Sequence, residues 1–200
     1  MLSGRLFVGK RLQKDIIFDE TSVFNRDNIF LPYITLRECF RETGIDLVTQ
    51  DRLSASKSLF DIYVNNPSAT ELPPNRSFLL VRESPLIRPD NFAVDLRGKY
   101  AKIFSWSKSH KNMNNSIFTP LPKLFPSETR FSAKGRKKSA VIIAGNKKSN
   151  SPGELYSYRD DIIQKFQVKD SEKLDLYGQG WELPVFSNSF LRRVSVRLPW

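Results

Sequence analysis

Residues 78–89 of this chain read FLLVRESPLIRP. The apolar residues Phe78 to Val81 follow one another without interruption, and the run ends in Arg82 and then in Glu83-Ser84-Pro85. A short apolar run that is bounded by turn-forming residues is typical of a buried strand. The stretch therefore predicts a buried strand with the carboxylate of Glu83 at its C-terminal end, and a proline that helps to fix the exit of the chain.

The segments around this strand predict a fold of the α/β class. Three further strands are expected at IDLVTQD (45–51), LFDIYV (59–64) and YAKIFSW (100–106), from their alternating or short apolar patterns. Apolar side chains at Tyr33, Leu36 and Phe40 recur at helical spacing, and Gly44 is a natural end for that helix. Strands that alternate with a helix indicate an α/β layout.

A change of composition divides the chain. Pro120, Pro122 and Pro126, followed by serine, threonine and basic residues, predict an extended linker over residues 120–137. We therefore expect an N-terminal α/β domain over residues 1–119 and a second α/β portion over residues 138–200. A doubly wound domain needs about a hundred residues. The second portion is shorter than that and is predicted to be incomplete.

The second portion predicts a strand–helix–strand unit. SAVIIAG (139–145) is a short unbroken strand, and EKLDLYGQGW (172–181) gives another strand and a glycine turn. Between them, Ser151 is suited to cap a helix, Pro152 to its first position and Glu154 to complete a capping box. The order strand, loop, helix, strand makes a βαβ unit.

The net charge of +11 predicts an anionic partner. Nucleic acid, an anionic membrane surface and a phosphorylated ligand are all open on this ground. The basic residues between 130 and 148 either contact such a partner or form a solvated linker. No apolar run is long enough for a membrane span or a secretory signal, so we expect a cytoplasmic protein.

The composition argues against metal and disulfide chemistry. Cys39 is the single cysteine and lies in a helical pattern of apolar residues, where plain packing is expected. His110 is the single histidine, and its polar surroundings, SKSHKNMNN, predict a surface loop. Neither residue has partners at the spacing of metal ligands, so no metal is expected.

Glu83 is the first candidate for chemistry. Ligands of open α/β sheets bind outside the carboxyl ends of the strands, where Glu83 falls if its strand is parallel. A partly shielded carboxylate in that place can take a proton from a hydroxyl group during group transfer. An ordinary surface glutamate before a turn would show the same pattern, so both interpretations stay open.

The second candidate is an anion site around the loop GNKKSN (145–150). The loop lies between a strand and the N-terminus of a helix, where main-chain N–H groups favour anions, and Lys147 and Lys148 add charge. Solvated lysines are the alternative, and no phosphate-binding loop motif occurs. Arg159, on the following helix, can bind a diphosphate through two nitrogens or pair with the neighbouring aspartates.

Five blocks of the sequence, taken in order, resemble glycosyltransferase family 10. This family contains the α-1,3/1,4-fucosyltransferases and their bacterial relatives that build surface polysaccharides. The blocks are DNIFLPYITLRECFRETGIDLVTQD (27–51), FLLVRESPLIRPDNF (78–92), YAKIFSWS (100–107), IIAGNKKSNSPGELYSYRDDIIQKF (142–166) and LDLYGQGW (174–181). Each block is modest by itself, and their order makes the resemblance fairly specific.

The resemblance implies a GT-B fold, in which two Rossmann-like domains face each other across a cleft. The N-terminal domain would bind a glycan acceptor, and the C-terminal portion would bind GDP-fucose as the donor substrate. Transfer would invert the anomeric centre without a metal or other cofactor. The family's base stands in a Glu-Ser-Pro motif that matches Glu83. Gly145 and Asn146 match a pair of residues near the nucleotide, and Arg159 best matches the basic residue that meets the diphosphate.

The chain departs from this family after residue 181. The family continues with a lysine-rich helix, a strand bearing Phe-Glu-Asn and a Gly-Tyr-x-Thr-Glu-Lys segment with most donor contacts, and none of these occurs here. We therefore expect an incomplete donor domain, from a truncated, frameshifted or split gene. Activity of this polypeptide alone is accordingly in doubt.

Two alternatives to a transferase come from other classes of protein. The first is a basic nucleic-acid-binding module, but no binding motif occurs and the basic residues are not interleaved with aromatic ones. The second is a non-catalytic remnant that associates with a sugar-transferase partner. The charge would also suit attachment to the anionic inner face of the membrane, where lipid-linked acceptors are found.

Overall fold

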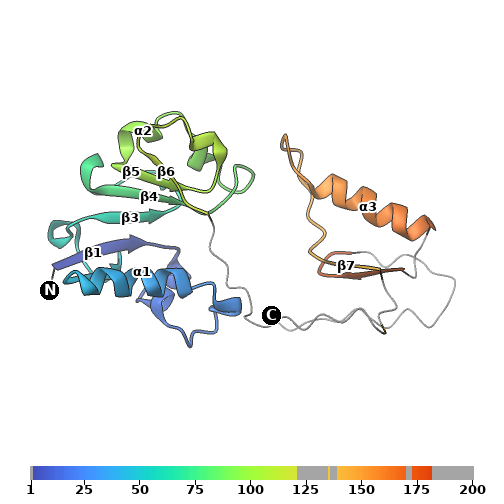
Figure 1. The fold of residues 1–200 in the computed structure, drawn as a ribbon, viewed down its shortest axis with the longest axis horizontal. Helices are drawn as coiled ribbons and strands as arrows, with labels where there is room; N and C mark the ends of the chain where they lie inside the picture. The colour runs from blue at the N-terminus through green and yellow to red at the C-terminus, as the bar shows by residue number, and fades with distance from the viewer. Residues whose placement is uncertain (1, 121–134, 136–138, 170–172, 182–200) are drawn as a thin grey trace. The chain divides into compact units, whose positions relative to one another are not determined.

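The computed structural model describes residues 2–120, 135, 139–169 and 173–181 (Figure 1). The chain divides into two compact units, Met1–Ser127 and Glu128–Trp200, which we call unit 1 and unit 2. The division falls inside segment 120–137, which the sequence predicts as a linker. Most of that segment lies outside the described residues.

Unit 1 is built on a six-stranded sheet in which all neighbouring strands run parallel. In spatial order the strands are β2 (Ile45–Thr49), β1 (Leu2–Phe7), β3 (Asp61–Val64), β4 (Ser77–Val81), β5 (Lys102–Ser105) and β6 (Ser116–Phe118). Their carboxyl ends therefore meet at one edge of the sheet. This confirms the α/β class and is compatible with a Rossmann-like fold.

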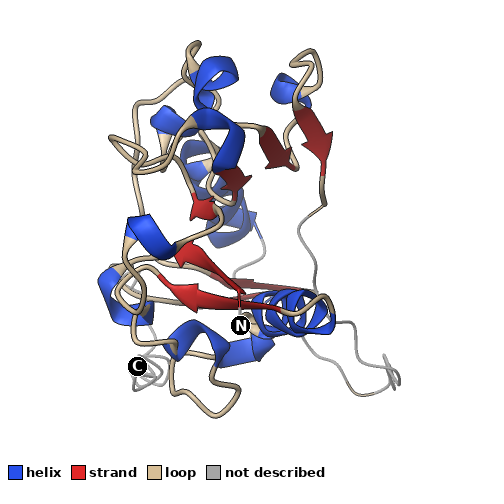
Figure 2. Cartoon of the chain, turned by 90° about the vertical axis from the view of Figure 1, so that its left-hand side faces the viewer, coloured by secondary structure: helices blue, strands red, loops and turns tan. Residues whose placement is uncertain are grey.

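The helices of unit 1 are few and mostly short. The longest is α1 (Leu31–Glu42), with Pro32 in its first turn, and α2 (Leu96–Lys99) is a single turn. Short 3₁₀ helices, drawn with the other helices in blue in Figure 2, occupy Lys10–Leu12, Ile16–Phe18, Arg26–Asn28, Ala55–Lys57, Pro74–Arg76, Pro89–Phe92 and Lys108–His110. Many strands are therefore joined by irregular chain whose polar side chains must satisfy the main chain.

Two apolar clusters cover the two faces of this sheet. Ile62 of β3 belongs to the cluster that includes Tyr33 of α1, whereas the next residue, Tyr63, belongs to the other cluster with Leu79 and Ile103. Successive side chains of a strand point to opposite faces, which explains the division. One face of β4 is thus buried, as its apolar run predicts, whereas Phe78 and Leu80 on the other face are half-buried.

A buried ion pair joins β1 to β3 within this sheet. The Arg5 guanidinium donates to both carboxylate oxygens of Asp61, at 2.9 and 2.7 Å, and both residues are buried. The hydroxyl of Tyr63 donates to the same carboxylate at 3.0 Å, and Arg5 also donates to Glu71 at 2.9 Å. Because each charge has its partner, the burial of Arg5 is tolerated.

Two expectations for unit 1 are wrong at the level of single residues. His110 is 1 % exposed instead of lying on a surface loop, because its ring stacks on Phe92 and its Nδ1 contacts Ser105. Cys39 is exposed instead of packed, because it faces away from the side of α1 on which Phe40 packs against the apolar cluster. The described residues contain no group of three potential metal ligands.

Unit 2 is a βαβ unit, as expected from the sequence. Strands β7 (Ala140–Ile143) and β8 (Leu174–Tyr177) pair in parallel, and α3 (Tyr156–Lys169) connects them (Figure 1). Ile163 of α3 is buried, whereas Val141 and Ile143 on one side of β7 are 57 % and 74 % exposed. The described part of unit 2 thus leaves one face of its small sheet uncovered.

The start of α3 differs from the predicted capping box. The helix begins at Tyr156 and not at Pro152, and Glu154 caps it: its Oε2 accepts the main-chain N–H groups of Tyr156 and Ser157 at 2.5 and 3.1 Å. Ser151 instead starts a turn, in which its carbonyl oxygen accepts the Glu154 N–H. The predicted helix is confirmed, and its predicted cap is wrong.

Among the described residues, no helix has the length and apolar character needed to cross a bilayer.

Candidate functional site

Glu83 lies beyond the carboxyl end of a central strand of unit 1. β4 pairs in parallel with β3 on one side and with β5 on the other, and Glu83 follows its last residue, Val81, by two positions. Because its strand is parallel to both neighbours, Glu83 lies at the edge of the sheet where ligands of open α/β sheets bind. Its side chain is exposed and forms no hydrogen bond or ion pair with any residue that the structure describes.

The main chain around Glu83 is held by a side chain from the neighbouring strand end. Asn65, directly after β3, has a φ of +68°, a left-handed conformation that asparagine tolerates better than most residues. In this conformation its Oδ1 accepts the N–H groups of Arg82 and Glu83, both at 2.9 Å. The same oxygen accepts a third hydrogen bond, from Nδ2 of Asn91, at 2.9 Å.

Two further asparagines complete this arrangement. Asn91 is fully buried, and its Oδ1 accepts the Asn66 N–H at 2.7 Å while its Nδ2 lies 3.3 Å from the Glu83 carbonyl oxygen. Asn66 is buried as well, and its Oδ1 accepts the hydroxyl of Tyr100 at 2.5 Å. We call Asn65, Asn66 and Asn91 the asparagine cluster.

The sequence interpretation did not find the asparagine cluster. Asn65-Asn66-Pro67 was interpretable only as the end of a strand, and Asn91 lies 26 residues after Asn65. The available signal was the pair of asparagines at a strand end, because asparagine is enriched at left-handed positions. The proline that was expected to fix the exit, Pro85, lies in a turn in which Ser84 O accepts the Ile87 and Arg88 N–H groups.

Arg82 and Glu83 place opposite charges near the first turn of α1. The Arg82 guanidinium carbon lies 5.7 Å from the centre of the Tyr33 ring. Burial raises the pKa of Tyr33, the charge of Arg82 lowers it, and the charge of Glu83 raises it. Tyr33 therefore lies beside Arg82, and the charges of Arg82 and Glu83 act on its hydroxyl in opposite directions.

Asn146 lies where the loops after β7 and β8 meet. Its N–H donates to Gln179 O at 2.8 Å and its Nδ2 to Gly180 O at 2.9 Å, while its Oδ1 is buried without a partner among the described residues. Gly178, with a φ of +135°, is required here, because a Cβ would lie 2.0 Å from Ala144 O. The glycine turn expected after β8 thus reflects the close approach of Gly178 to Ala144.

Arg159 lies between two aromatic rings. Its guanidinium carbon is 5.2 Å from the ring centre of Tyr156 and 5.8 Å from that of Trp181, whose indole N–H donates to Ala144 O at 2.6 Å. Its Nε and Nη2 are buried and have no partner within the described part of the chain. The alternative pairing with the neighbouring aspartates is not observed there.

The contacts of Gly180 and Trp181 bring Asn146 and Arg159 together, because Asn146 bonds to the first and Arg159 stacks on the second. Buried donors without a partner cost free energy that a bound anion would recover. Lys147 and Lys148 are exposed on the adjoining loop and contribute charge only. This end of unit 2 can therefore hold an anion.

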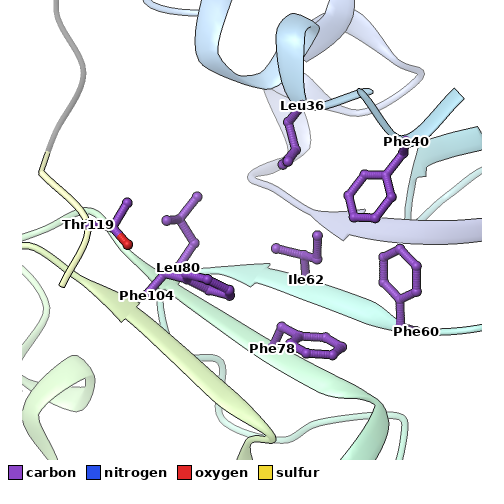
Figure 3. Close-up of a pocket in the computed structure, with 8 residues that line it drawn as sticks. All are labelled: Leu36, Phe40, Phe60, Ile62, Phe78, Leu80, Phe104 and Thr119. Carbon is purple, nitrogen blue, oxygen red and sulfur yellow. The ribbon is translucent and has the colours of Figure 1, made fainter. Parts of the chain in front are cut away.

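A separate apolar groove lies between α1 and the strands β3, β4 and β5 (Figure 3). It encloses about 430 Å³ and is lined by Leu36, Phe40, Phe60, Ile62, Phe78, Leu80, Phe104 and Thr119. No charged side chain lines it and Thr119 is its one residue with a polar side chain, so it offers no partner for the charge of a phosphate. It does not contribute to the candidate site.

Comparisons with protein families, with curated proteins and with solved structures found no match for this chain.

Proposed function

We propose that this chain takes part in glycosyl transfer of the fucosyltransferase type, a reaction that inverts the anomeric centre and needs no metal. Unit 1 would bind a glycan acceptor, and unit 2 would supply part of a site for GDP-fucose, in the manner of a GT-B enzyme. The observation that carries the proposal is Glu83: an exposed carboxylate without a partner among the described residues, at the carboxyl end of a central parallel strand.

The proposed reaction requires one base and one leaving-group site. The acceptor hydroxyl oxygen attacks the anomeric carbon of fucose, and the Glu83 carboxylate takes the hydroxyl proton. The bond between the anomeric carbon and the diphosphate oxygen breaks with its electron pair, and GDP leaves. Because the attack comes from the side opposite the leaving group, the anomeric configuration inverts.

The features of unit 2 support the proposed donor site. The departing diphosphate gains negative charge, and Arg159 can donate hydrogen bonds to it through Nε and Nη2, the atoms that lack a partner among the described residues. Lys147 adds positive charge on the loop, and Asn146 offers a buried oxygen as an acceptor. The two cations suit the diphosphate of a nucleotide sugar, and the Asn146 oxygen suits one of its hydroxyl groups.

A transfer assay on the full chain tests this proposal. GDP-fucose with a labelled sugar is incubated with the protein and a panel of glycan acceptors, and labelled product is counted. Replacing Glu83→Gln keeps the shape of the side chain and removes the base, so we expect turnover to fall by about a hundredfold or more. Glu38→Gln, on the exposed side of α1, is the matched control and should leave turnover unchanged. Equal turnover by Glu83→Gln and the wild type would contradict the proposal that Glu83 is the base.

A further inference from the structure

The main chain of Glu83 is held by hydrogen bonds, whereas its side chain is not. The N–H group donates to Asn65, and the carbonyl oxygen is approached by Asn91, so the peptide is held on both sides. The carboxylate, by contrast, contacts no described partner. Rigid support beneath a free functional group is the arrangement that a reacting side chain requires.

We propose that Asn65 and Asn91 are positioning residues for Glu83, and that they set the rate of proton removal through the placement of its carboxylate. The inference rests on the proposed function, because it presumes that Glu83 acts as the base. It adds two residues that contact neither substrate and act only through the Glu83 main chain.

The hydrogen bonds of Asn65 give it this role. One oxygen accepts two consecutive main-chain N–H groups and one side-chain amide, each at 2.9 Å. Three bonds to one atom fix the direction in which the chain leaves β4. A base must lie within hydrogen-bond reach of its proton, so a shift of about 1 Å would cost roughly a hundredfold in rate.

Asn91 secures Asn65 from the interior. It is fully buried, it donates to Asn65 Oδ1, and its own Oδ1 accepts the Asn66 N–H. Since Asn66 is in turn bonded to the hydroxyl of Tyr100, the cluster is anchored to the residue that follows α2, two positions before β5. The position of Glu83 is therefore tied to the carboxyl ends of β3 and β4 and to the end of α2.

Substitutions at Asn65 separate its conformation from its hydrogen bonds. Asn65→Gly keeps the left-handed main chain at little cost and removes the acceptor, whereas Asn65→Asp keeps an acceptor oxygen. Asn28→Gly is the matched control, because Asn28 is an exposed asparagine with a positive φ of 54°. Asn91→Asp is a second variant, which keeps the acceptor for Asn66 and loses the donor to Asn65.

The first measurement is hydrogen exchange of the Arg82 and Glu83 amides in the full chain, followed by NMR. We expect faster exchange in Asn65→Gly and Asn91→Asp, and rates like the wild type in Asn65→Asp and Asn28→Gly. This readout needs no donor or acceptor, so it tests the hydrogen bonds independently of the proposed function. Unchanged exchange in Asn65→Gly would overturn the inference.

The second measurement is steady-state transfer by the same variants. For Asn65→Gly we expect kcat to fall by about 10- to 100-fold with KM unchanged, and Asn65→Asp should recover most of the loss. Faster exchange with full kcat would overturn the positioning role and leave the proposed function intact. Absence of both GDP-fucose binding and transfer by the wild-type chain would overturn the proposed function, and the positioning role with it.

Discussion

His110 is a titratable side chain in a buried position just after β5. Its Nδ1 lies 2.7 Å from the Ser105 hydroxyl oxygen, and its ring stacks on Phe92 with a distance of 4.7 Å between ring centres. Its Nε2 is buried. Burial lowers the pKa of His110, because a charged imidazolium would lose its hydration there, and a hydrogen bond with the Asn91 main chain opposes this shift only in part.

This depressed pKa predicts that stability depends on pH. The unfolded chain binds a proton on His110 near its ordinary pKa of 6.5, whereas the folded chain binds it only at lower pH. The contribution to the free energy of unfolding is therefore complete above that value and is lost as the pH falls toward the folded-state pKa. Urea denaturation at about pH 7.5 and about pH 5.5 measures the loss. His110→Phe should lose less stability over this interval than the wild type, and an equal loss would contradict the assignment.

The position of some single residues could be predicted from the sequence, and that of others could not. Glu83 could be predicted, because an apolar run and a turn place it at a strand end. The support from Asn65 and Asn91 could not, because it depends on which strands become neighbours. The burial of His110 has the same cause: its neighbours in sequence are polar, and its neighbour in space is Phe92.

At the scale of elements, the strands with apolar patterns were predictable and the others were not. β1 contains Gly4 and the buried Arg5, which interrupt any apolar pattern. Both make sense only in the folded protein, since Arg5 pairs with Asp61 and a Cβ on Gly4 would lie 2.5 Å from the Phe60 ring. β6 (Ser116–Phe118) is short and partly exposed at the sheet edge, so it carries too little pattern to identify.

The first turn of α3 shows why an element boundary is harder to predict than the element. The spacing of Ser151 and Glu154 fits a capping box. The same glutamate can also cap a helix that starts two residues after it, at Tyr156. Hydrogen bonds from Ser157 hold the pKa of Glu154 below its usual value, as expected of a carboxylate at a helix N-terminus.

Two alanine variants distinguish the two possible caps of α3. Glu154→Ala should speed hydrogen exchange of the Tyr156 and Ser157 amides by about fivefold, the factor that a typical N-cap contributes. Ser151→Ala should leave both rates within error of the wild type. Amide exchange followed by NMR measures this, and the reverse ranking of the two variants would restore the predicted capping box.

At the scale of the whole molecule, the proposed function divides between the two units. The candidate base is on unit 1, and the candidate anion site is on unit 2, in a chain whose net charge is +11. The α/β class and the βαβ unit were predictable from strand order alone. The GT-B arrangement and the identity of the donor rest on a resemblance in sequence, and they stay proposals.

Binding of the donor is the most direct test, because it needs no knowledge of the acceptor. GDP-fucose is titrated into the full chain in a calorimeter, and the titration is repeated with Arg159→Ala and with Lys165→Ala, an exposed cation of the same helix. The account predicts saturable binding that Arg159→Ala weakens about tenfold or more and that Lys165→Ala leaves unchanged. No saturable binding by the wild type, or equal binding by Arg159→Ala, would contradict it.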